Sequence, residues 1–366
     1  MSISIPPKAN ELEISIFGPG RGESVLIHLG NDEWCVVDSC IARGRRQPAA
    51  LEYLEALGTN AAGVKLVVAT HWHNDHINGL STIVRQAPSA KFCCSMALKR
   101  DEFTTLISSF SEGTEERSGV DELSSILSQL RQTGRLAPMW AVENKRLLHW
   151  PDRPRAFPIS VTTLSPSDVS ITLALREIAG LIPAEGKPQR RIVNRSPNHA
   201  SVVLWLQAGA IRALLGADLE HSGRVGEGWM AIIASHQDST PGVIFKVPHH
   251  GSPNGDCPEV WEKLLAQNSL AVVTPFTGGR VRLPRDSDLE RLSGRTTKLY
   301  CTAAGAGKPP SRDPSVERSL RTQLRDRRVV AGQPGHVRMR WSATSETAEP
   351  KIELFNGAYH VPSVVS

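Results

Sequence analysis

Four side chains that can bind a metal ion occupy six consecutive positions of the chain: His71, His73, Asp75 and His76. Imidazole nitrogens suit zinc and a carboxylate can bridge two cations, so this set favours Zn²⁺ or Mn²⁺ over Ca²⁺ or Mg²⁺. The alternative is a solvated helix start that merely happens to be rich in histidine. We predict a metal site, because four such residue types at this spacing rarely coincide by chance.

Other apolar segments also end on a residue that can bind a metal. The segment "CVVD" ends on Asp38, "RALLGAD" ends on Asp218, and "GVIFKVPHH" ends on the pair His249 and His250. The loops at the carboxyl ends of strands converge in α/β sheets, so we expect these side chains to lie near the histidine-rich stretch. Six or seven ligands are enough for two metal ions. The absence of cysteine from the set argues against a purely structural zinc.

The elements around the histidine-rich stretch are predicted from apolar patterns. Residues 64–70 are continuously apolar, which is typical of a strand buried on both faces, and residues 77–87 carry apolar side chains on one helical face. Earlier in the chain, residues 12–17 and 24–29 are predicted to form a β-hairpin, followed by a strand at 33–40. The stretch therefore lies on a strand-to-helix turn.

The rest of the chain alternates between helical and extended patterns. Residues from about 95 to 197 are predicted to be mainly helical, with one strand at 159–164 and a polar, basic loop at 183–198. Further helices are predicted at 47–57, 101–110, 119–134 and 165–178, and further strands at 201–206, 211–218, 242–250 and 270–276. Residues 336–341 and 351–355 are predicted to form a closing hairpin. This order predicts two sheets with helices outside them, a layered α/β sandwich.

Composition limits the class of protein. The chain has 366 residues, of which 40% are hydrophobic and 22% charged, as expected for a globular protein with a substantial core. The net charge of +5 is too small to indicate nucleic-acid binding by itself. No segment has the length and apolarity of a membrane span, and the first residues lack the pattern of a signal peptide. We therefore expect a cytoplasmic location, with no membrane partner and with the six cysteines kept as thiols.

The histidine-rich stretch resembles the H-x-H-x-D-H signature of the metallo-β-lactamase superfamily. Three other segments resemble the hydrolase domain of DNA-uptake (competence) channel proteins: "GPGRGESVLI" its G-x-G-D-S-x-L-I opening, "NHASVVLWL" its N-x-x-S-x-V-L strand, and "KVPHHGS" its H-H-G-S turn. The resemblance covers residues 11–302. It implies one domain over residues 1–366, a four-layer αββα metallo-β-lactamase sandwich with a helical and loop insertion at about 95–197 and a C-terminal β-hairpin.

The resemblance also implies a centre with two Zn²⁺ ions, or with Mn²⁺ in their place. His71 and His73 would bind the first ion, and Asp218 would bridge the two ions. The third protein ligand of the first ion is open between Asn198 and His199, because the superfamily uses histidine there and the DNA-uptake relatives show asparagine.

For the second ion, the resemblance assigns Asp75 and His76 as ligands. One residue of the adjacent pair His249 and His250 would complete this ion, with His250 favoured, and the other would face the substrate. Asp38 resembles an aspartate of the superfamily that orients a ligand histidine.

The chain also departs from the DNA-uptake relatives. "GADLE" stands where they have G-D, and Leu283-Pro284 stand where they often carry a G-H-P turn. No membrane channel accompanies the domain. A function in DNA uptake therefore does not follow from the resemblance.

Basic and amide side chains lie beside the predicted metal ligands in the sequence. The candidates for binding a substrate are Arg43, Arg45, Arg46, Arg190, Arg191 and Asn198. Arginine pairs well with phosphate, so we expect an anionic substrate, a phosphodiester or a nucleic acid. Basic runs are more often solvated surface, and the sequence carries no readable sign of a protein partner.

The predicted activity is that of a metal-dependent hydrolase, a phosphodiesterase or nuclease in the first place. A hydroxide bridging the two metals would attack the substrate, with Asp75 accepting a hydrogen bond from it and His249 stabilising or protonating the leaving group. The same metals would serve a carboxylic-ester, lactone or thioester hydrolase. A third hypothesis is that the protein is a non-catalytic regulatory or binding subunit of a larger assembly. A true β-lactamase is not favoured, because no export signal is found.

Overall fold

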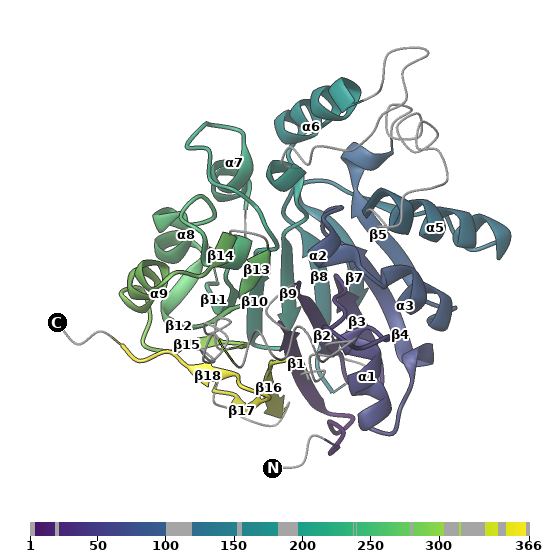
Figure 1. The fold of residues 1–366 in the computed structure, drawn as a ribbon, viewed down its shortest axis with the longest axis horizontal. Helices are drawn as coiled ribbons and strands as arrows, with labels where there is room; N and C mark the ends of the chain where they lie inside the picture. Colours follow the sequence, from purple (N-terminus) through teal and green to yellow (C-terminus); the bar gives the residue numbers. More distant parts are fainter. Residues whose placement is uncertain are drawn as a thin grey trace.

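The computed structural model describes residues 4–18, 22–99, 119–151, 156–181, 197–236, 238, 240–278, 281–303, 315, 334–342 and 349–363. Within these residues, two eight-stranded sheets pack face to face and helices cover their outer faces (Figure 1). The α/β sandwich predicted from the sequence is therefore confirmed.

The first sheet is built mainly from the amino-terminal half of the chain. Its strands, in spatial order, are β17 (Lys351–Phe355), β16 (His336–Ser342), β1 (Glu11–Phe17), β2 (Ser24–His28), β3 (Trp34–Val37), β4 (Val64–Ala69), β5 (Lys91–Ser95) and β6 (Met139–Ala141). The pairs β1–β2 and β16–β17 are antiparallel, which confirms both predicted hairpins. From β3 to β6 the strands run parallel, so their carboxyl ends lie along one end of the sheet.

The second sheet contains the strands of the later half. In spatial order they are β18 (Tyr359–His360), β15 (Leu299–Cys301), β12 (Leu265–Val273), β11 (Gly242–Lys246), β10 (Ile211–Leu215), β9 (Leu204–Ala208), β8 (Ile159–Thr163) and β7 (Lys145–Trp150). The strands β10, β11, β12 and β15 run parallel. A separate small ribbon consists of β13 (Phe276–Gly278) and β14 (Val281–Leu283). Consecutive strands occupy the outer edges of the two sheets, β6 and β7 on one side and β17 and β18 on the other.

The helices form the outer layers. They are α1 (Ala49–Ala56), α2 (Asn74–Ile77), α3 (Leu80–Gln86), α5 (Gly119–Gln132), α6 (Asp168–Leu181), α7 (Gly228–Ser235), α8 (Pro258–Lys263) and α9 (Asp286–Ser293), with 3₁₀ turns at Ala61–Gly63, Met96–Leu98, Pro197–Ala200 and His249–Gly251. One apolar core lies between the sheets. A second core joins α1, α3 and α5 to the first sheet, and a third joins α7, α8 and α9 to the other (Figure 1). These layers correspond to the predicted αββα order.

Some elements differ from the sequence prediction. The helix expected at 77–87 is α3, which begins only at Leu80 because Gly79 before it has a left-handed φ of 84°; Ile77 instead ends the short helix α2. The region 95–197 supplies β6 and β7 to the sheets as well as helices, and neither strand was predicted. The predicted helix at 101–110 and most of the predicted loop at 183–198 lie outside the described residues. That residues 1–366 form one domain stays a prediction.

Candidate metal centre

Asp38 fixes the geometry of the strand ends that carry the histidines. It is the first residue after β3, and its carboxylate accepts hydrogen bonds from the backbone N–H of Thr70 at 2.8 Å and from the Thr70 hydroxyl at 2.7 Å. The same carboxylate lies 2.8 Å from Nδ1 of His76. Because an ionised carboxylate can only accept, His76 donates from Nδ1 and keeps the lone pair of Nε2 for the interior of the site.

Two further histidine rings are held by Nδ1 in the same way. His71 Nδ1 lies 2.9 Å from the hydroxyl of Thr70, which already donates to Asp38 and therefore accepts from the ring. His250 Nδ1 donates to the backbone carbonyl of Thr274 at 3.0 Å. Each ring thus presents Nε2 to the interior, as metal-binding histidines do when the other nitrogen is hydrogen-bonded.

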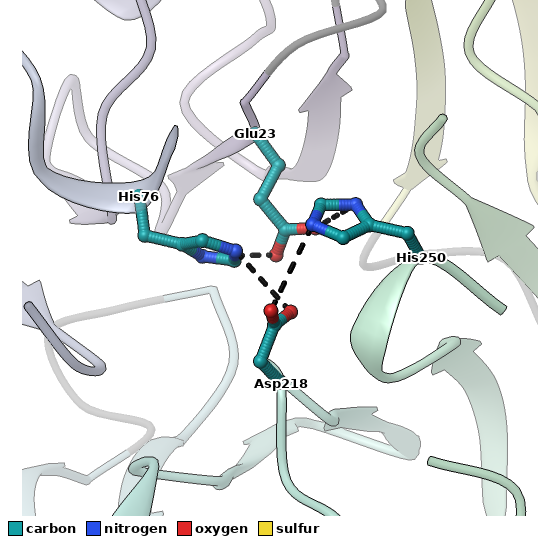
Figure 2. A group of neighbouring side chains, drawn as sticks. All are labelled: Glu23, His76, Asp218 and His250. Atoms are coloured by element: carbon teal, nitrogen blue, oxygen red, sulfur yellow. Dashed lines mark ion pairs between the residues drawn. The ribbon is translucent and has the colours of Figure 1, made fainter. Parts of the chain in front are cut away.

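Asp218 lies where the three Nε2 atoms converge. Its Oδ1 is 3.2 Å from Nε2 of His76, and its Oδ2 is 3.8 Å from Nε2 of His71 and 3.7 Å from Nε2 of His250. Figure 2 shows Asp218 pointing from the second sheet toward His76, which comes from α2 beside the first sheet. All of these side chains are buried. The site therefore lies between the two sheets and takes donors from both.

Asp75 and His73 complete the set of donors in the histidine-rich stretch. Oδ2 of Asp75 is 3.2 Å from Nε2 of His250 and 3.7 Å from Nε2 of His76. His73, the residue before α2, places Nδ1 3.1 Å from Nε2 of His71. All four residues of the stretch, His71, His73, Asp75 and His76, are thus brought together with Asp218 and His250, as expected from the sequence.

Three overlapping groups of donor atoms, all from described residues, lie at the centre. One of them, Asp38, His71 and His76, is held by the hydrogen bonds of Asp38 and Thr70 described above, and the other two share Asp218. Among the described residues, the donors of Glu23, His76, Asp218 and His250 lie within 4.8 Å of one another, and so do those of His71, His73 and Asp218. Asp218 belongs to both groups. This is the arrangement that a carboxylate bridging two cations requires.

The donor set fits metal ions by an independent criterion. Nε2 of His76 and Oδ1 of Asp218 are buried and make no hydrogen bond to any described residue, although they lie 3.2 Å apart. Buried polar atoms without a partner typically cost about 1–3 kcal/mol each, so such atoms call for a ligand. Tetrahedral zinc with bonds of about 2.1 Å holds neighbouring donor atoms about 3.4 Å apart. The observed separations, from 3.1 Å to 3.8 Å, lie around that value.

The electrostatics of the centre also favour a cation. Burial alone would raise the pKa of Asp218, but His76, His250 and His71 outweigh it and hold the pKa well below its usual value. Burial alone would lower the pKa of His76, yet the carboxylates of Asp218, Glu23 and Asp75 raise it well above 6.5. The buried carboxylates thus require positive charge close by.

Glu23 and Lys246 contribute to the centre and were not selected from the sequence. Glu23 is buried, with Oε1 2.5 Å from Nζ of Lys246 and Oε2 accepting from the hydroxyl of Thr274 at 2.6 Å. Lys246 Nζ also donates to the carbonyl of Ala217, next to Asp218, at 2.9 Å. A sequence signal existed for both: Glu23 occupies the acidic position of the "GRGESVLI" opening, and Lys246 is a charged residue inside the apolar strand "GVIFKV".

The backbone separates the rings of His249 and His250. Both residues have left-handed φ values, 48° and 51°, so the two side chains leave the turn in different directions. His250 enters the centre and stacks on Phe276. His249 lies at the rim, with Nε2 accepting from Nδ2 of Asn198 at 3.3 Å and Nδ1 3.5 Å from Oε1 of Glu220.

The two candidates for the third ligand of the first ion lie on the 3₁₀ turn before β9. His199 has Nε2 3.9 Å from Oε2 of Glu177 and belongs to none of the groups of converging donor atoms found among the described residues. Asn198 has a buried Oδ1 that makes no hydrogen bond to a described residue. Which of the two binds the metal stays a prediction.

The predicted substrate residues are placed only in part. Arg43 and Arg46 are exposed in the loop between β3 and α1, and Arg45 is half-buried there. This loop leaves the first sheet at the end where Asp38 lies. Arg190 and Arg191 lie outside the described residues.

The solved structures to which the chain is similar, at low sequence identity, are metallo-beta-lactamases. A HARLDQ-motif mutant enzyme from Cronobacter sakazakii is 12% identical, with 57% of this chain and 63% of that chain covered and a TM-score of 0.32. SMB-1 in complex with mercaptoacetic acid is also 12% identical, with 68% and 82% covered and a TM-score of 0.36. The subclass B3 enzyme MEM-A1 from a soil metagenome library is 13% identical, with 68% and 83% covered and a TM-score of 0.34. The chain thus spans less than two thirds of the length of the first of these proteins.

The remaining findings concern curated relatives and helices that could cross a membrane. No curated protein matches the chain. In the part of the chain that the structure describes, no helix has the length and apolarity needed to cross a bilayer.

The family follows from the sequence match together with the centre described above. The family model described as Metallo-beta-lactamase superfamily matches residues 17–256, which include every described donor of the centre. The finer resemblance to DNA-uptake channel proteins stays a prediction. The chain belongs to the metallo-beta-lactamase superfamily, a superfamily of metal-dependent hydrolases.

Proposed function

We propose that this chain is a hydrolase with two metal ions, Zn²⁺ or Mn²⁺, that cleaves phosphodiester bonds. The observation that carries the proposal is the position of Asp218, whose two oxygens face both groups of donor atoms. Bound divalent ions supply Lewis acidity, which lowers the pKa of a water molecule and stabilises negative charge that develops on the substrate.

The protein's own residues hold the ions and manage the protons. His71 and His73 would bind one ion, with Asn198 or His199 as the further ligand. Asp75, His76 and His250 would bind the other. This assignment explains why both sheets must deliver residues to the same point.

Proton transfer would involve Asp75 and His249. Burial would raise the pKa of Asp75, but His76 and His250 lower it below its usual value, so this carboxylate is ionised at neutral pH and can accept a hydrogen bond from the attacking water. His249 lies at the rim between Asn198 and Glu220, where it can donate a proton to the leaving group.

The preference for a phosphodiester is supported by positive charge in the loop that follows Asp38. Exposed Arg43 and Arg46 lie in the loop that leaves β3 beside Asp38. A guanidinium forms two parallel hydrogen bonds to phosphate, a geometry that a neutral ester or lactone does not offer. The sequence resemblance to the hydrolase domain of DNA-uptake proteins supports the same substrate class.

A substrate panel on the full-length chain tests the proposal. We expect turnover of bis-p-nitrophenyl phosphate and none of thioesters, lactones or a chromogenic β-lactam, with at least about two metal ions bound per chain. Turnover of one of the other substrates alone would overturn the substrate class. If the chain binds no metal ion when metal is supplied in excess, the proposed metal-dependent hydrolysis is wrong.

The substitution Asp218→Asn tests the site separately from the substrate. It keeps the shape of the side chain but removes the bridging charge, so we expect turnover to fall more than about 100-fold, with a loss of bound metal measured by elemental analysis. Asp238→Asn is the matched control, because Asp238 pairs with Arg212 away from the centre. Equal turnover in the two variants would contradict the assignment of Asp218.

A further inference from the structure

A second cluster of metal-binding residue types lies apart from the centre described above. His221, Cys257 and Glu259 each offer a donor atom, and these atoms lie within 4.8 Å of one another. Sγ of Cys257 is 3.2 Å from Oε2 of Glu259. Cys257 is buried, and the other two side chains are half-buried. The cluster therefore combines sulfur, nitrogen and oxygen donors in one small, partly enclosed volume.

The cluster joins two separate segments of the chain. His221 follows Asp218 in the segment after β10, and its backbone N–H donates to the carbonyl of Asn254 at 2.6 Å. Cys257 and Glu259 lie where α8 begins, in the segment that follows His250. The main-chain bond keeps these segments adjacent without help from the three side chains. Their convergence is thus built into the fold.

One ring nitrogen of His221 has no hydrogen-bond partner among the described residues. This atom, Nδ1, is buried. The thiol of Cys257 is left with a weak hydrogen bond to a carboxylate. Burial, followed by the carboxylate of Glu259, raises the pKa of this thiol to about 12, while the backbone N–H of Val260 acts in the opposite direction. A cation bound by the three side chains would replace this weak hydrogen bond with direct ligand contacts.

We propose that His221, Cys257 and Glu259 form a separate Zn²⁺ site that links the segment after β10 to the start of α8. Zinc accepts thiolate, imidazole and carboxylate together, whereas Ca²⁺ and Mg²⁺ require oxygen ligands. Binding converts the Cys257 thiol to a thiolate and releases its proton to solvent. Three protein ligands leave a fourth position of the tetrahedron for water.

The site would stabilise the rim of the hydrolytic centre. The two segments that it links carry Asp218 and His250, and between them Glu220 accepts hydrogen bonds from Asn198 and Asn254, each at 3.1 Å. Fixing His221 against Cys257 limits the movement of both segments relative to each other. The inference does not depend on which substrate the centre hydrolyses.

Cobalt spectroscopy on the full-length chain tests the site. A thiolate bound to Co²⁺ gives a charge-transfer band in the near ultraviolet, and the donors of the hydrolytic centre are nitrogen and oxygen only. We expect this band in the natural chain and its loss in Cys257→Ser, together with about one fewer metal ion per chain. Cys301→Ser is the matched control, because Cys301 is equally buried and belongs to none of the donor groups. No band in the fully loaded natural chain, or a band that persists in Cys257→Ser, would overturn the proposal.

His221→Gln gives a second test that leaves the buried thiol in place. We expect this variant to bind about one Zn²⁺ ion fewer per chain and to gain less thermal stability from added Zn²⁺ than the natural chain does. The ions of the hydrolytic centre should remain, so the two sites are distinguished by stoichiometry. A variant that binds as much zinc as the natural chain would show that His221 is not a ligand and would overturn the three-residue site.

Discussion

Asp38 orients other residues of the centre. Its carboxylate makes no hydrogen bond to the Nε2 atoms that point into the centre. It accepts two hydrogen bonds from Thr70 and one from Nδ1 of His76. These bonds set the tautomer and orientation of His76 and, through the Thr70 hydroxyl, of His71. Asp38 is therefore a positioning residue for both groups of donors.

Replacing Asp38 tests that role. Asp38→Asn puts an amide where a carboxylate accepts three hydrogen bonds, so we expect metal affinity to fall about 10-fold to 100-fold, measured by competition with a chromophoric chelator. Asp32→Asn is the control, because Asp32 is exposed and has a similar left-handed φ, 56° against 59°. Unchanged affinity in Asp38→Asn would contradict the positioning role.

The sequence predicted the donors that follow a visible pattern. His71, His73, Asp75 and His76 stand close together in the chain, and Asp38 and Asp218 end apolar strands, so types and spacing were enough to select them. Glu23 was missed because its partners, Lys246 and Thr274, are remote in the chain, the latter by 251 positions. The acidic position of the "GRGESVLI" opening is a local signal for Glu23, but it does not show which residues Glu23 contacts in the fold.

The chain breaks between α2, which carries Asp75 and His76, and α3 at Gly79. Gly79 has a φ of 84°, and a Cβ there would lie 2.9 Å from Ile41 Cδ1 and from Pro48 Cγ. Gly79→Ala should therefore lower the free energy of unfolding by more than the about 1–2 kcal/mol that a left-handed backbone alone costs. Urea unfolding measures the loss.

Gly58→Ala is the matched control for Gly79→Ala. Gly58 has a comparable φ of 75°, but nothing lies within 4 Å of the added Cβ. Gly58→Ala should therefore lower the free energy of unfolding only by the cost of the left-handed backbone. Equal losses in the two variants would mean that the contact with Ile41 and Pro48 contributes nothing.

The pairing of β16 with β1 buries a histidine that should make stability depend on pH. Burial, then Arg338 and Arg340, hold the pKa of His336 well below its usual value of 6.5. Between the two pKa values the unfolded chain binds the extra proton, so stability falls as the pH drops below about 6.5 and is constant above it, with a slope of at most about 1.4 kcal/mol per pH unit.

The variant His336→Phe isolates this contribution. It removes the titrating group and keeps an aromatic ring beside Phe17 and Phe355, which the histidine ring contacts. Urea unfolding from about pH 5 to about pH 7.5 should show a smaller loss of stability on acidification in the variant. Above about pH 7 the difference between the two proteins should not vary. Parallel curves over the whole range would refute the prediction.

Elements were predictable where apolar periodicity was long enough. The pattern located the strands around the centre and the closing hairpin, because each is a sustained apolar or alternating run. β6 has only three residues, and β7 carries the exposure pattern of an irregular edge strand, so neither stood out. Their pairing is decided by the neighbouring strands rather than by their own sequences.

At the scale of the whole molecule, the centre takes donors from both layers, and an apolar core lies between the two sheets. Removing the metal ions should therefore lower the thermal midpoint of the entire fold. At a metal concentration of 100 times Kd, each site contributes about 2.7 kcal/mol. Calorimetry with and without a strong chelator measures this shift, and added Zn²⁺ should reverse it. In Asp218→Asn the chelator should have a smaller effect, and an equal shift would contradict the location of the ions.

The edges of the sandwich determine how the molecule can deform. At one side β6 leads directly into β7, and at the other β17 leads directly into β18, so short covalent connections close both flanks. Because a short connection joins the two sheets at each of these edges, the sheets cannot open there as a hinge would allow. These connections limit how far the two layers that carry His76 and Asp218 can separate. Any adaptation to substrates of different size must then come from the loops above the strand ends.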